Sequence, residues 1–516
     1  MMDIGINGKN TQVYGQYWYI GDTIHIKARK SVKGAGNLIN LRDIYFGCSD
    51  ADTEAERKPE IFKKVFFDPH NYLEDLLRGN RFMLRGRKGD GKTAFSAQMQ
   101  LIADSLNIYA CKKSLNNFNN VTFSEIKSYD ALGGNPYISF WKCIILIEYV
   151  GMIVKFEPNV QTPDFVSIVS SLNEKGFISV DNDIALTIKK LVETDSTLNI
   201  KNAFQHQRKY GIETHLCGAE EIYRAVRDSI KNIYLAKSFA LLIDGLDDIL
   251  INSEFKPEII TGLIRAINEI NSVFNHTTLR IKTIIFIRDD ILALCRDPNL
   301  SKITRDSSIH LSWTIDGDPF DSDLLQLVEK RVVEATGGCN SLENVWSEIF
   351  PPYIGSKPSV EYVLDNIIYR PRDILQFFIE VQKEFQPGQK ITIDKLQTVL
   401  EKYSDEYFVD AMEDELTGFF PNEVVTHLPD VLMQMGSQYF YQDQFQKECS
   451  NYTAFTGVST TSILERLFNA GYIGQHRPKT KNDDYTVFSY RNPREKFVPE
   501  HECIVHRGLR RALTIP

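Results

Sequence analysis

A glycine-rich run in the first quarter of the chain has the most specific chemistry. It matches the GxxxxGK[ST] pattern in full and consists of Gly86, Arg87, Lys88, Gly89, Asp90, Gly91, Lys92 and Thr93. Its glycines let successive backbone N–H groups point at phosphate oxygens, and the N-terminus of a following helix adds partial positive charge. We expect Lys92 to reach the β- and γ-phosphates of bound ATP and the hydroxyl of Thr93 to bind Mg²⁺. The eight residues together predict a nucleotide-binding loop.

A group of carboxylates follows the apolar run at 239–243. Asp244 ends this predicted strand, where a buried carboxylate is costly unless something pairs with it. We expect the strand to lie beside the phosphate loop, so that Asp244 meets the Mg²⁺ held by Thr93. Asp247 or Asp248 would then orient the attacking water, and the sequence leaves that choice open. An acidic turn that binds no metal is the alternative interpretation.

Arg288 ends a second apolar run, at 281–287. In an open parallel sheet the carboxyl ends of the strands face the ligand crevice. Arg288 is therefore a candidate sensor that contacts the γ-phosphate. The alternative is a structural ion pair with Asp289 or Asp290.

Two further arginines lie at the start of a predicted helix, because Pro371 is well suited to the first helical turn. These are Arg370 and Arg372, and cations are unfavourable at a helix N-terminus unless an anion is near. We therefore expect both to reach the nucleotide, or an acidic patch, from a helical lid.

Short apolar strands that alternate with helices must position these residues. Strands are expected at 81–84, 239–243, 281–287 and 309–313, and helices at 94–106 and between 255 and 274. Buried strands separated by helices indicate an α/β fold, here a P-loop core whose parallel sheet has helices on both faces.

The pattern divides the chain into four parts. They are a β-hairpin or association element at 1–40, an ATPase core at 41–320 with a helical insertion at about 112–230, a lid of helices only at 321–412, and a C-terminal module at 413–516. The hairpin either packs as an edge on the core or pairs with another chain, as an exposed aromatic-rich strand can.

The C-terminal module is expected to contain helices at 428–436, 439–450 and 459–470, followed by strand-like segments. This order resembles a winged helix. In a DNA-binding version the third helix would enter the major groove and a wing at 476–486 would touch the backbone. That helix carries Arg466 as its single cation. A protein-contact module is therefore the alternative.

Composition limits the classes of partner. The chain has 516 residues and a net charge of -9, with 59 basic against 68 acidic residues, which does not predict general polyanion binding. Its longest apolar stretch, at 140–154, is too short for a membrane span and predicts a buried core helix. Scattered cysteines and an N-terminus unlike a signal peptide predict a cytoplasmic protein without a membrane partner.

Four segments together resemble the P-loop ATPases of the AAA+ and STAND superclass: the phosphate loop, the LLIDGLDD segment, the strand ending in Arg288 and the RPRD helix start. Residues 46–54, FGCSDADTE, are similar to an FGxxDAxxE element that precedes the P-loop in a group of bacterial ATPases often linked to prokaryotic defence. The resemblance covers residues 41–400 and implies an ATP- and Mg²⁺-dependent ATPase. Asp248 stands where STAND ATPases usually have Glu, which bears on hydrolysis more than on binding.

Three functions are consistent with these features. The first is an ATP-binding and ATP-hydrolysing regulatory switch that forms a homo-oligomer and acts with a protein effector partner, in antiphage defence if the resemblance extends to role. The second is an initiator-like ATPase that binds nucleic acid through the C-terminal module. The third is a scaffold that binds nucleotide without hydrolysing it.

Overall fold

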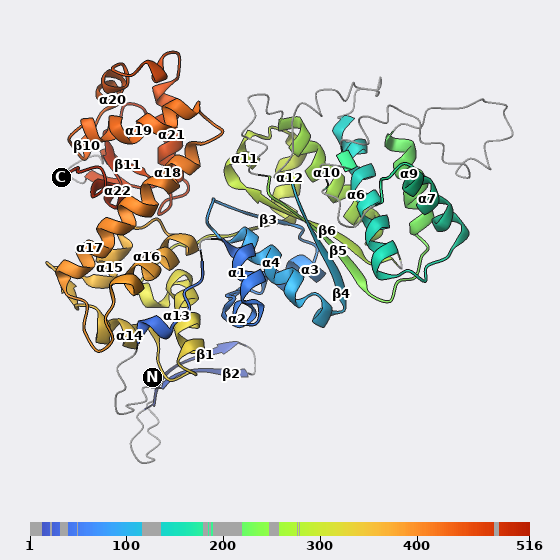
Figure 1. The fold of residues 1–516 in the computed structure, drawn as a ribbon, viewed down its shortest axis with the longest axis horizontal. Helices are drawn as coiled ribbons and strands as arrows, with labels where there is room; N and C mark the ends of the chain where they lie inside the picture. The colour runs from blue at the N-terminus through green and yellow to red at the C-terminus, as the bar shows by residue number, and fades with distance from the viewer. Residues whose placement is uncertain are drawn as a thin grey trace.

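The computed structural model places a sheet-containing core beside a column formed by the helical lid and the C-terminal module (Figure 1). The structure describes residues 40–48, 50–115, 136–178, 184, 187–188, 219–246, 257–275, 277, 279–478 and 484–516, and the backbone of two N-terminal strands at 13–20 and 23–30. The phosphate loop touches the column directly, because Arg87 donates a hydrogen bond to the carbonyl of Tyr369.

The core is built on a five-stranded sheet with the order β4-β5-β6-β3-β7. Every neighbouring pair of strands is parallel. The bounds of the strands are β3 Met83–Gly86, β4 Ile108–Ser114, β5 Ser238–Asp244, β6 Ile281–Arg288 and β7 Ser308–His310. The predicted α/β fold with a parallel sheet is confirmed.

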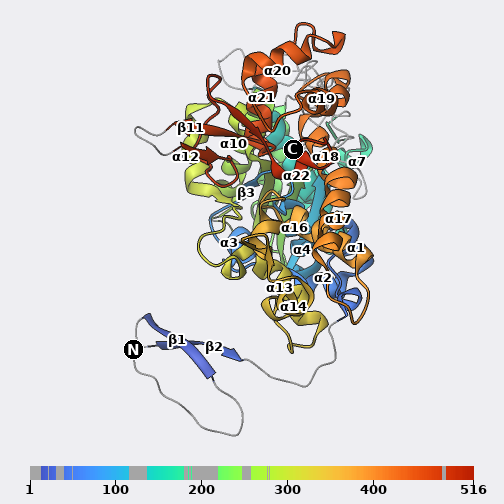
Figure 2. The ribbon, with the colours of Figure 1, turned by 90° about the vertical axis from the view of Figure 1, so that its left-hand side faces the viewer.

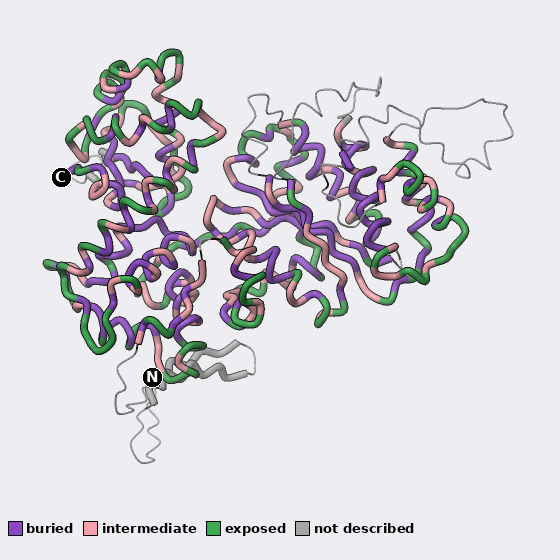
Figure 3. The backbone as a smooth tube through the Cα atoms, in the orientation of Figure 1, coloured by how far each residue is buried: buried purple, intermediate pink, exposed green. Residues whose placement is uncertain are grey.

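Helices cover both faces of this sheet, which explains its continuous apolar strands. Successive side chains of a strand point to opposite faces. Along β5, Leu241 and Ile243 join one hydrophobic cluster, and Ala240 and Leu242 join another. Strands β3, β5 and β6 are accordingly buried along most of their length (Figure 3).

The first cluster contains residues of α6 Pro136–Phe156, α7 Pro163–Glu174, α9 Ala219–Ile230 and α10 Pro257–Phe274, among other helices. Those on the other side of the sheet are α1 Ala51–Arg57, α2 Pro59–Val65, α3 Tyr72–Arg78 and α4 Lys92–Ile102 (Figure 1). Two short helices, α11 Asp289–Leu294 and α12 Pro298–Ser307, connect β6 to β7.

The most apolar helix among the described residues is α6. It is long and apolar enough to span a membrane by length and composition, but 78% of its most apolar window is buried inside the protein. Trp141 also donates a hydrogen bond of 3.0 Å to the carbonyl of Ile259 in α10. The predicted buried core helix is therefore confirmed.

The prediction that the strand ending in Asp244 lies beside the phosphate loop is wrong. Strand β6 lies between β5 and the loop strand β3, and Gly86 is paired in register with Arg288. An apolar pattern predicts that a strand is buried but not its place in the sheet, which explains the error. Boundaries also differ: the helix predicted at 94–106 is α4, which ends at Ile102, and the strand predicted at 309–313 is the three-residue β7.

The lid consists of α13 Asp323–Ala335, α14 Leu342–Ile349, α15 Ser359–Leu364, α16 Pro371–Glu384 and α17 Ile393–Tyr403, and a short π-helical turn leads from it into α18 Val409–Leu416. The prediction of helices only is wrong in one detail. A small antiparallel pair, β8 Tyr353–Ile354 and β9 Lys357–Pro358, interrupts them. Gly355 adopts a φ of 62° in the intervening turn, a conformation that glycine tolerates without strain.

The C-terminal module has the predicted helices and a β-sheet, so its winged-helix-like fold is confirmed. Its helices are α19 Asn422–Gln434, α20 Gln442–Cys449, α21 Thr460–Ala470 and the short α22 Arg507–Arg510. Its sheet has the order β10 Tyr439–Phe440, β13 Cys503–Val505, β11 Ile473–Pro478 and β12 Asp484–Val487. The helix predicted at 439–450 starts later, because its first two residues form β10.

An antiparallel hairpin near the N-terminus, β1 Val13–Ile20 with β2 Thr23–Lys30, confirms the predicted strands. Figure 2 shows its two strands side by side. A two-stranded hairpin on its own is marginally stable at best in water. The role of this hairpin in association stays a prediction.

Candidate nucleotide-binding site

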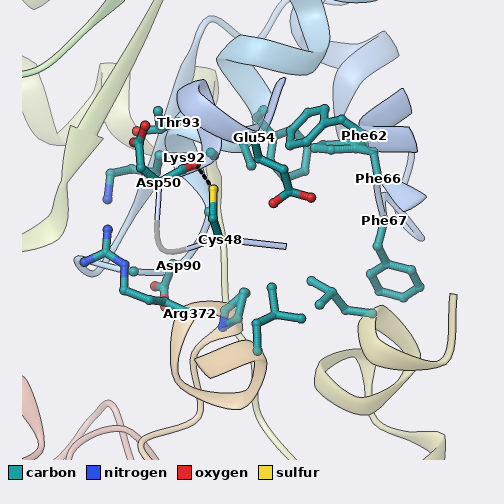
Figure 4. A pocket seen from close by; sticks show the side chains of 18 of the residues that line it. Cys48, Asp50, Glu54, Phe62, Phe66, Phe67, Asp90, Lys92, Thr93 and Arg372 are labelled. Carbon is teal, nitrogen blue, oxygen red and sulfur yellow. Dashed lines mark hydrogen bonds between the residues drawn. The ribbon is translucent and has the colours of Figure 1, made fainter. Parts of the chain in front are cut away.

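A pocket lies where the phosphate loop meets the segment before α1, the end of β5 and the start of α16. Figure 4 shows Lys92, Thr93 and Asp50 near one end, the rings of Phe66 and Phe67 toward the other, and Arg372 facing in from the lid. The pocket is thus polar and charged where phosphates would bind and aromatic where a base would bind. This arrangement suits a nucleotide.

The phosphate loop has the backbone geometry that its sequence predicts. Gly89 and Gly91 have φ values of 86° and 98°, in the left-handed region that favours glycine. Gly91 is the N-cap of α4, so the first turn of this helix opens onto the pocket. Lys92 donates to the carbonyls of Gly86 (3.2 Å) and Arg87 (2.8 Å), which holds its ammonium group across the loop.

Three side chains of the predicted phosphate loop form contacts within the protein. Asp90 is fully buried and accepts a hydrogen bond of 2.6 Å from the backbone N–H of Arg87, and burial raises the pKa of its carboxyl group. The Arg87 side chain reaches the carbonyl of Tyr369, and Lys88 donates to the carbonyl of Asp414 at 3.1 Å. Arg87 therefore braces the loop against the lid and Lys88 braces it against α18, while Asp90 closes the loop onto Arg87.

Asp244 reaches the start of α4 despite the intervening strand. It accepts hydrogen bonds from Ser96 (3.1 Å) and from the backbone of Gly245 (2.9 Å), and the ammonium of Lys112 lies 3.2 Å from the same carboxylate. The hydroxyl of Thr93 and this carboxylate are hard oxygen donors of the kind that Mg²⁺ prefers, so they fit that ion. The predicted water-orienting carboxylates, Asp247 and Asp248, lie outside the described residues.

The FGxxDAxxE segment forms one wall of the pocket. Asp50 caps α1 by accepting from the backbone of Thr53 at 2.8 Å. The buried Glu54 carboxylate lies 2.8 Å from Arg331 of α13, so it joins this wall to the lid. Gly47 has a φ of 102°, in the left-handed region that favours glycine, and a Cβ there would also lie 2.6 Å from the Glu54 carboxylate. The segment therefore builds the pocket and holds the lid against it.

The three candidate sensor arginines do not behave alike. Arg372 lines the pocket. Arg288 instead pairs with Asp290 at 2.6 Å and with Glu415 at 2.8 Å. The pair with Asp290 is the structural ion pair that the sequence offered as the alternative to a sensor. Arg370 pairs with Asp373 at 2.7 Å and with Glu415 at 3.3 Å. Arg288 and Arg370 are thus paired with carboxylates, whereas Arg372 faces the pocket.

Glu415, near the end of α18, is the centre of this network. A third guanidinium, that of Arg466 in α21, contacts Glu415 (3.4 Å) and Asp290 (2.6 Å). Burial alone would raise the pKa of Glu415, but the guanidinium groups of Arg288, Arg370 and Arg466 together lower it. One buried carboxylate therefore connects the core, the lid and the C-terminal module.

Sequence reasoning missed both Glu415 and Lys112. Nothing in the local pattern around Glu415 distinguishes it from other acidic residues, because its partners are distant in the chain. Lys112 had a detectable signal, since it lies near the carboxyl end of β4, where parallel strands present their ligand-binding groups.

Comparisons with known proteins add a family match for part of the chain. Residues 322–412 match the FunZ-associated C-terminal helical domain, and this range contains the lid helices α13 to α17. No curated protein matches the chain.

Three solved structures show distant likeness. ORC1 of Aeropyrum pernix in complex with DNA is 11% identical, with 89% of this chain and 92% of that chain covered and a TM-score of 0.36. Cdc6p of Pyrobaculum aerophilum is 13% identical (84% and 93% covered, TM-score 0.26), and ORC2 of Aeropyrum pernix with ADPNP and ADP is 12% identical (85% and 90% covered, TM-score 0.31). The fold assignment rests on the strand order and the phosphate loop described above.

Proposed function

We propose that this protein is an ATP-binding and ATP-hydrolysing switch of the AAA+ and STAND type. The observation that carries the proposal is the pocket in which Lys92, Thr93 and Asp244 meet at the N-terminus of α4. Backbone N–H groups, a helix N-terminus and a lysine at one point form an anion site that suits a triphosphate. Arg372 adds a cation from the lid.

The roles within the pocket follow from chemistry. Lys92 neutralises the β- and γ-phosphates, and the aromatic end bounded by Phe66 and Phe67 receives the base. Thr93 and Asp244 would hold Mg²⁺, which supplies positive charge that offsets the developing charge on the phosphates. Titration of the protein with a fluorescent ATP analogue, with Mg²⁺ and with EDTA, tests binding directly. Absence of saturable binding in both conditions contradicts the proposal.

Hydrolysis requires a group that orients water, and we assign this role to Asp247 or Asp248. Replacing each by asparagine in turn should separate them. The variant that loses the water-orienting carboxylate should release phosphate about 10²- to 10⁴-fold more slowly, while its ATP affinity stays near that of the parent. The other variant serves as its control.

Two outcomes of this phosphate-release assay decide between mechanisms. Parent-like rates in both variants would remove the assignment of Asp247 and Asp248. A parent protein that binds ATP but releases no phosphate, with or without protein or nucleic-acid partners, would favour the non-hydrolysing scaffold.

The switch follows from the position of the Glu415 network beside the loop. A Cβ at Gly89 would lie 3.3 Å from the Arg370 side chain, and Arg288 is the register neighbour of Gly86. A γ-phosphate bound here offers Arg288 and Arg370 a second anion, in competition with Glu415. A ligand shifts a conformational equilibrium by its differential contacts with the two states. ATP should therefore weaken the attachment of the C-terminal module to the core.

A DNA-handling ATPase is the second candidate, because the C-terminal module has a winged-helix-like fold. The single cation of α21, Arg466, faces the core and stacks over Phe419 at 3.7 Å, which removes it from any groove-facing surface in this arrangement. We therefore expect the nucleotide-free protein to bind duplex DNA weakly, and more tightly after ATP releases α21. Fluorescence anisotropy with a labelled duplex across a salt series measures this. No binding at low salt, with or without ATP, would eliminate the second candidate.

The cellular setting is proposed from the sequence resemblance. In a STAND-type switch the released state would form a homo-oligomer and recruit a protein effector, and the related bacterial ATPases suggest antiphage defence. Light scattering with and without ATP tests the oligomer. Phage protection measured in a Lys92→Ala strain tests the defence role, and its loss is the expected result.

A further inference from the structure

The ammonium group of Lys112 lies against the carboxylate of Asp244, the residue that would bind Mg²⁺. This side chain is 13% exposed and comes from β4, on the far side of β5 from the phosphate loop. Its ammonium group lies 2.6 Å and 2.7 Å from the two oxygens of Asp52 and 3.2 Å from Asp244. It therefore joins the FGxxDAxxE segment to the candidate metal ligand.

The contacts of Lys112 are unequal. Asp52 binds it through both carboxylate oxygens, whereas Asp244 also accepts hydrogen bonds from Ser96 and Gly245. Burial raises the pKa of the Asp52 carboxyl, with Lys112 acting in the opposite direction and Asp244 adding to the rise. Asp52 and Asp244 thus share one ammonium group, and Asp52 has the larger share.

We propose that Lys112 is a positioning residue that competes with Mg²⁺ for Asp244, and that Asp52 sets the strength of this competition by holding the ammonium group away. The inference rests on the proposed nucleotide site. A cation beside a metal ligand repels an incoming divalent ion, whereas an additional anion attracts it. Asp244 then holds a metal strongly only when a triphosphate brings further negative charge.

The two partners should have opposite effects, which separates this role from a structural one. Lys112→Met removes the competing charge and should lower the Mg²⁺ concentration at half-maximal binding of a fluorescent ATP analogue. Asp52→Asn releases the ammonium onto Asp244 and should raise that concentration. We expect each shift to be about tenfold, given one unit charge within about 4 Å in a partly solvated site. A merely structural role would raise the concentration in both variants.

Lys142→Met is the matched control. Lys142 has a similar exposure of 12% and also pairs with two carboxylates, Glu220 (3.5 Å) and Glu269 (3.2 Å), but on helices that cover the sheet away from the pocket. Its Mg²⁺ midpoint should equal that of the parent.

The experiment uses the full chain and two readouts, the Mg²⁺ midpoint of nucleotide binding and the affinity for Mn²⁺ measured by paramagnetic resonance with ADP present. Opposite shifts in the Lys112→Met and Asp52→Asn variants, seen in both readouts, support the proposal. Shifts of the same sign, or no shift, overturn it while the nucleotide site stands. A parent protein that binds no nucleotide at any Mg²⁺ concentration overturns both.

Discussion

Lys92→Ala is expected to weaken ATP binding roughly 10- to 100-fold and to slow phosphate release about 10²- to 10³-fold. In the structure this buried ammonium spans the loop through the carbonyls of Gly86 and Arg87. With a nucleotide present it would exchange these neutral partners for anionic phosphate oxygens. Bonds to ionised partners are about twice as strong as neutral ones, so the loss should fall on the bound state. Nucleotide titration and a phosphate-release assay measure the two effects.

Lys63→Ala is a suitable control for this prediction. Lys63 is 35% exposed on α2, beside the pocket, and pairs only with Glu60 among the contacts that the structure describes. Its removal should leave affinity and hydrolysis unchanged. Retained ATP binding together with undiminished activity in the Lys92→Ala variant would show that the loop does not act as a nucleotide site.

Glu415→Gln is expected to lower the free energy of unfolding by roughly 3–5 kcal/mol, the cost of breaking a buried ion pair by removing one partner. Three guanidinium groups converge on this carboxylate, and Asp290 and Asp373 compensate them only in part. The variant should also detach the C-terminal module without ATP, seen as faster proteolysis between the lid and the module. Chemical denaturation and limited proteolysis measure the two effects.

Asp414→Asn is the matched control, because Asp414 is the adjacent residue in α18. Its side chain is 67% exposed, and its carboxylate comes no closer than 3.6 Å to the ammonium group of Lys88. It should change stability by less than about 1 kcal/mol. Equal effects of the two variants would contradict the central position of Glu415.

The same network predicts an acid limit to stability. The folded-state pKa of Glu415 lies below its ordinary value, because three guanidinium groups outweigh the effect of burial. A carboxyl with a lowered pKa contributes stability at neutral pH, and this contribution is lost as pH falls through the carboxyl range. Glu415→Gln should therefore flatten the acid side of the stability profile.

The parts of the fold that were predictable are those encoded by local pattern. The apolar runs of β5 and β6 and the glycines of the phosphate loop specify strand, turn and helix within short stretches of sequence. The order of strands is not local, and the position of β6 between β3 and β5 therefore escaped prediction. Asp244 still reaches α4, because the carboxyl ends of parallel strands share one edge of the sheet.

The residues of the site also divide into those that local pattern predicts and those that only distant contacts bring together. Lys92, Thr93 and Arg372 were predicted, and the structure brings them to one pocket. Glu415 was not, since its contact with Arg288 joins residues 127 positions apart and depends on how the C-terminal module packs on the core. Long-range ion pairs of this kind leave no periodic or motif signal in a single sequence.

Hydrogen–deuterium exchange of the full chain, with and without ATP and Mg²⁺, tests the switch most directly. The proposal predicts slower exchange across residues 86–93 and, at the same time, faster exchange in α18 and α21, where Glu415 and Arg466 hold the module to the core. Both changes should disappear in the Lys92→Ala variant. Protection of the phosphate loop with unchanged exchange in α18 and α21 would contradict the proposed coupling between nucleotide and C-terminal module.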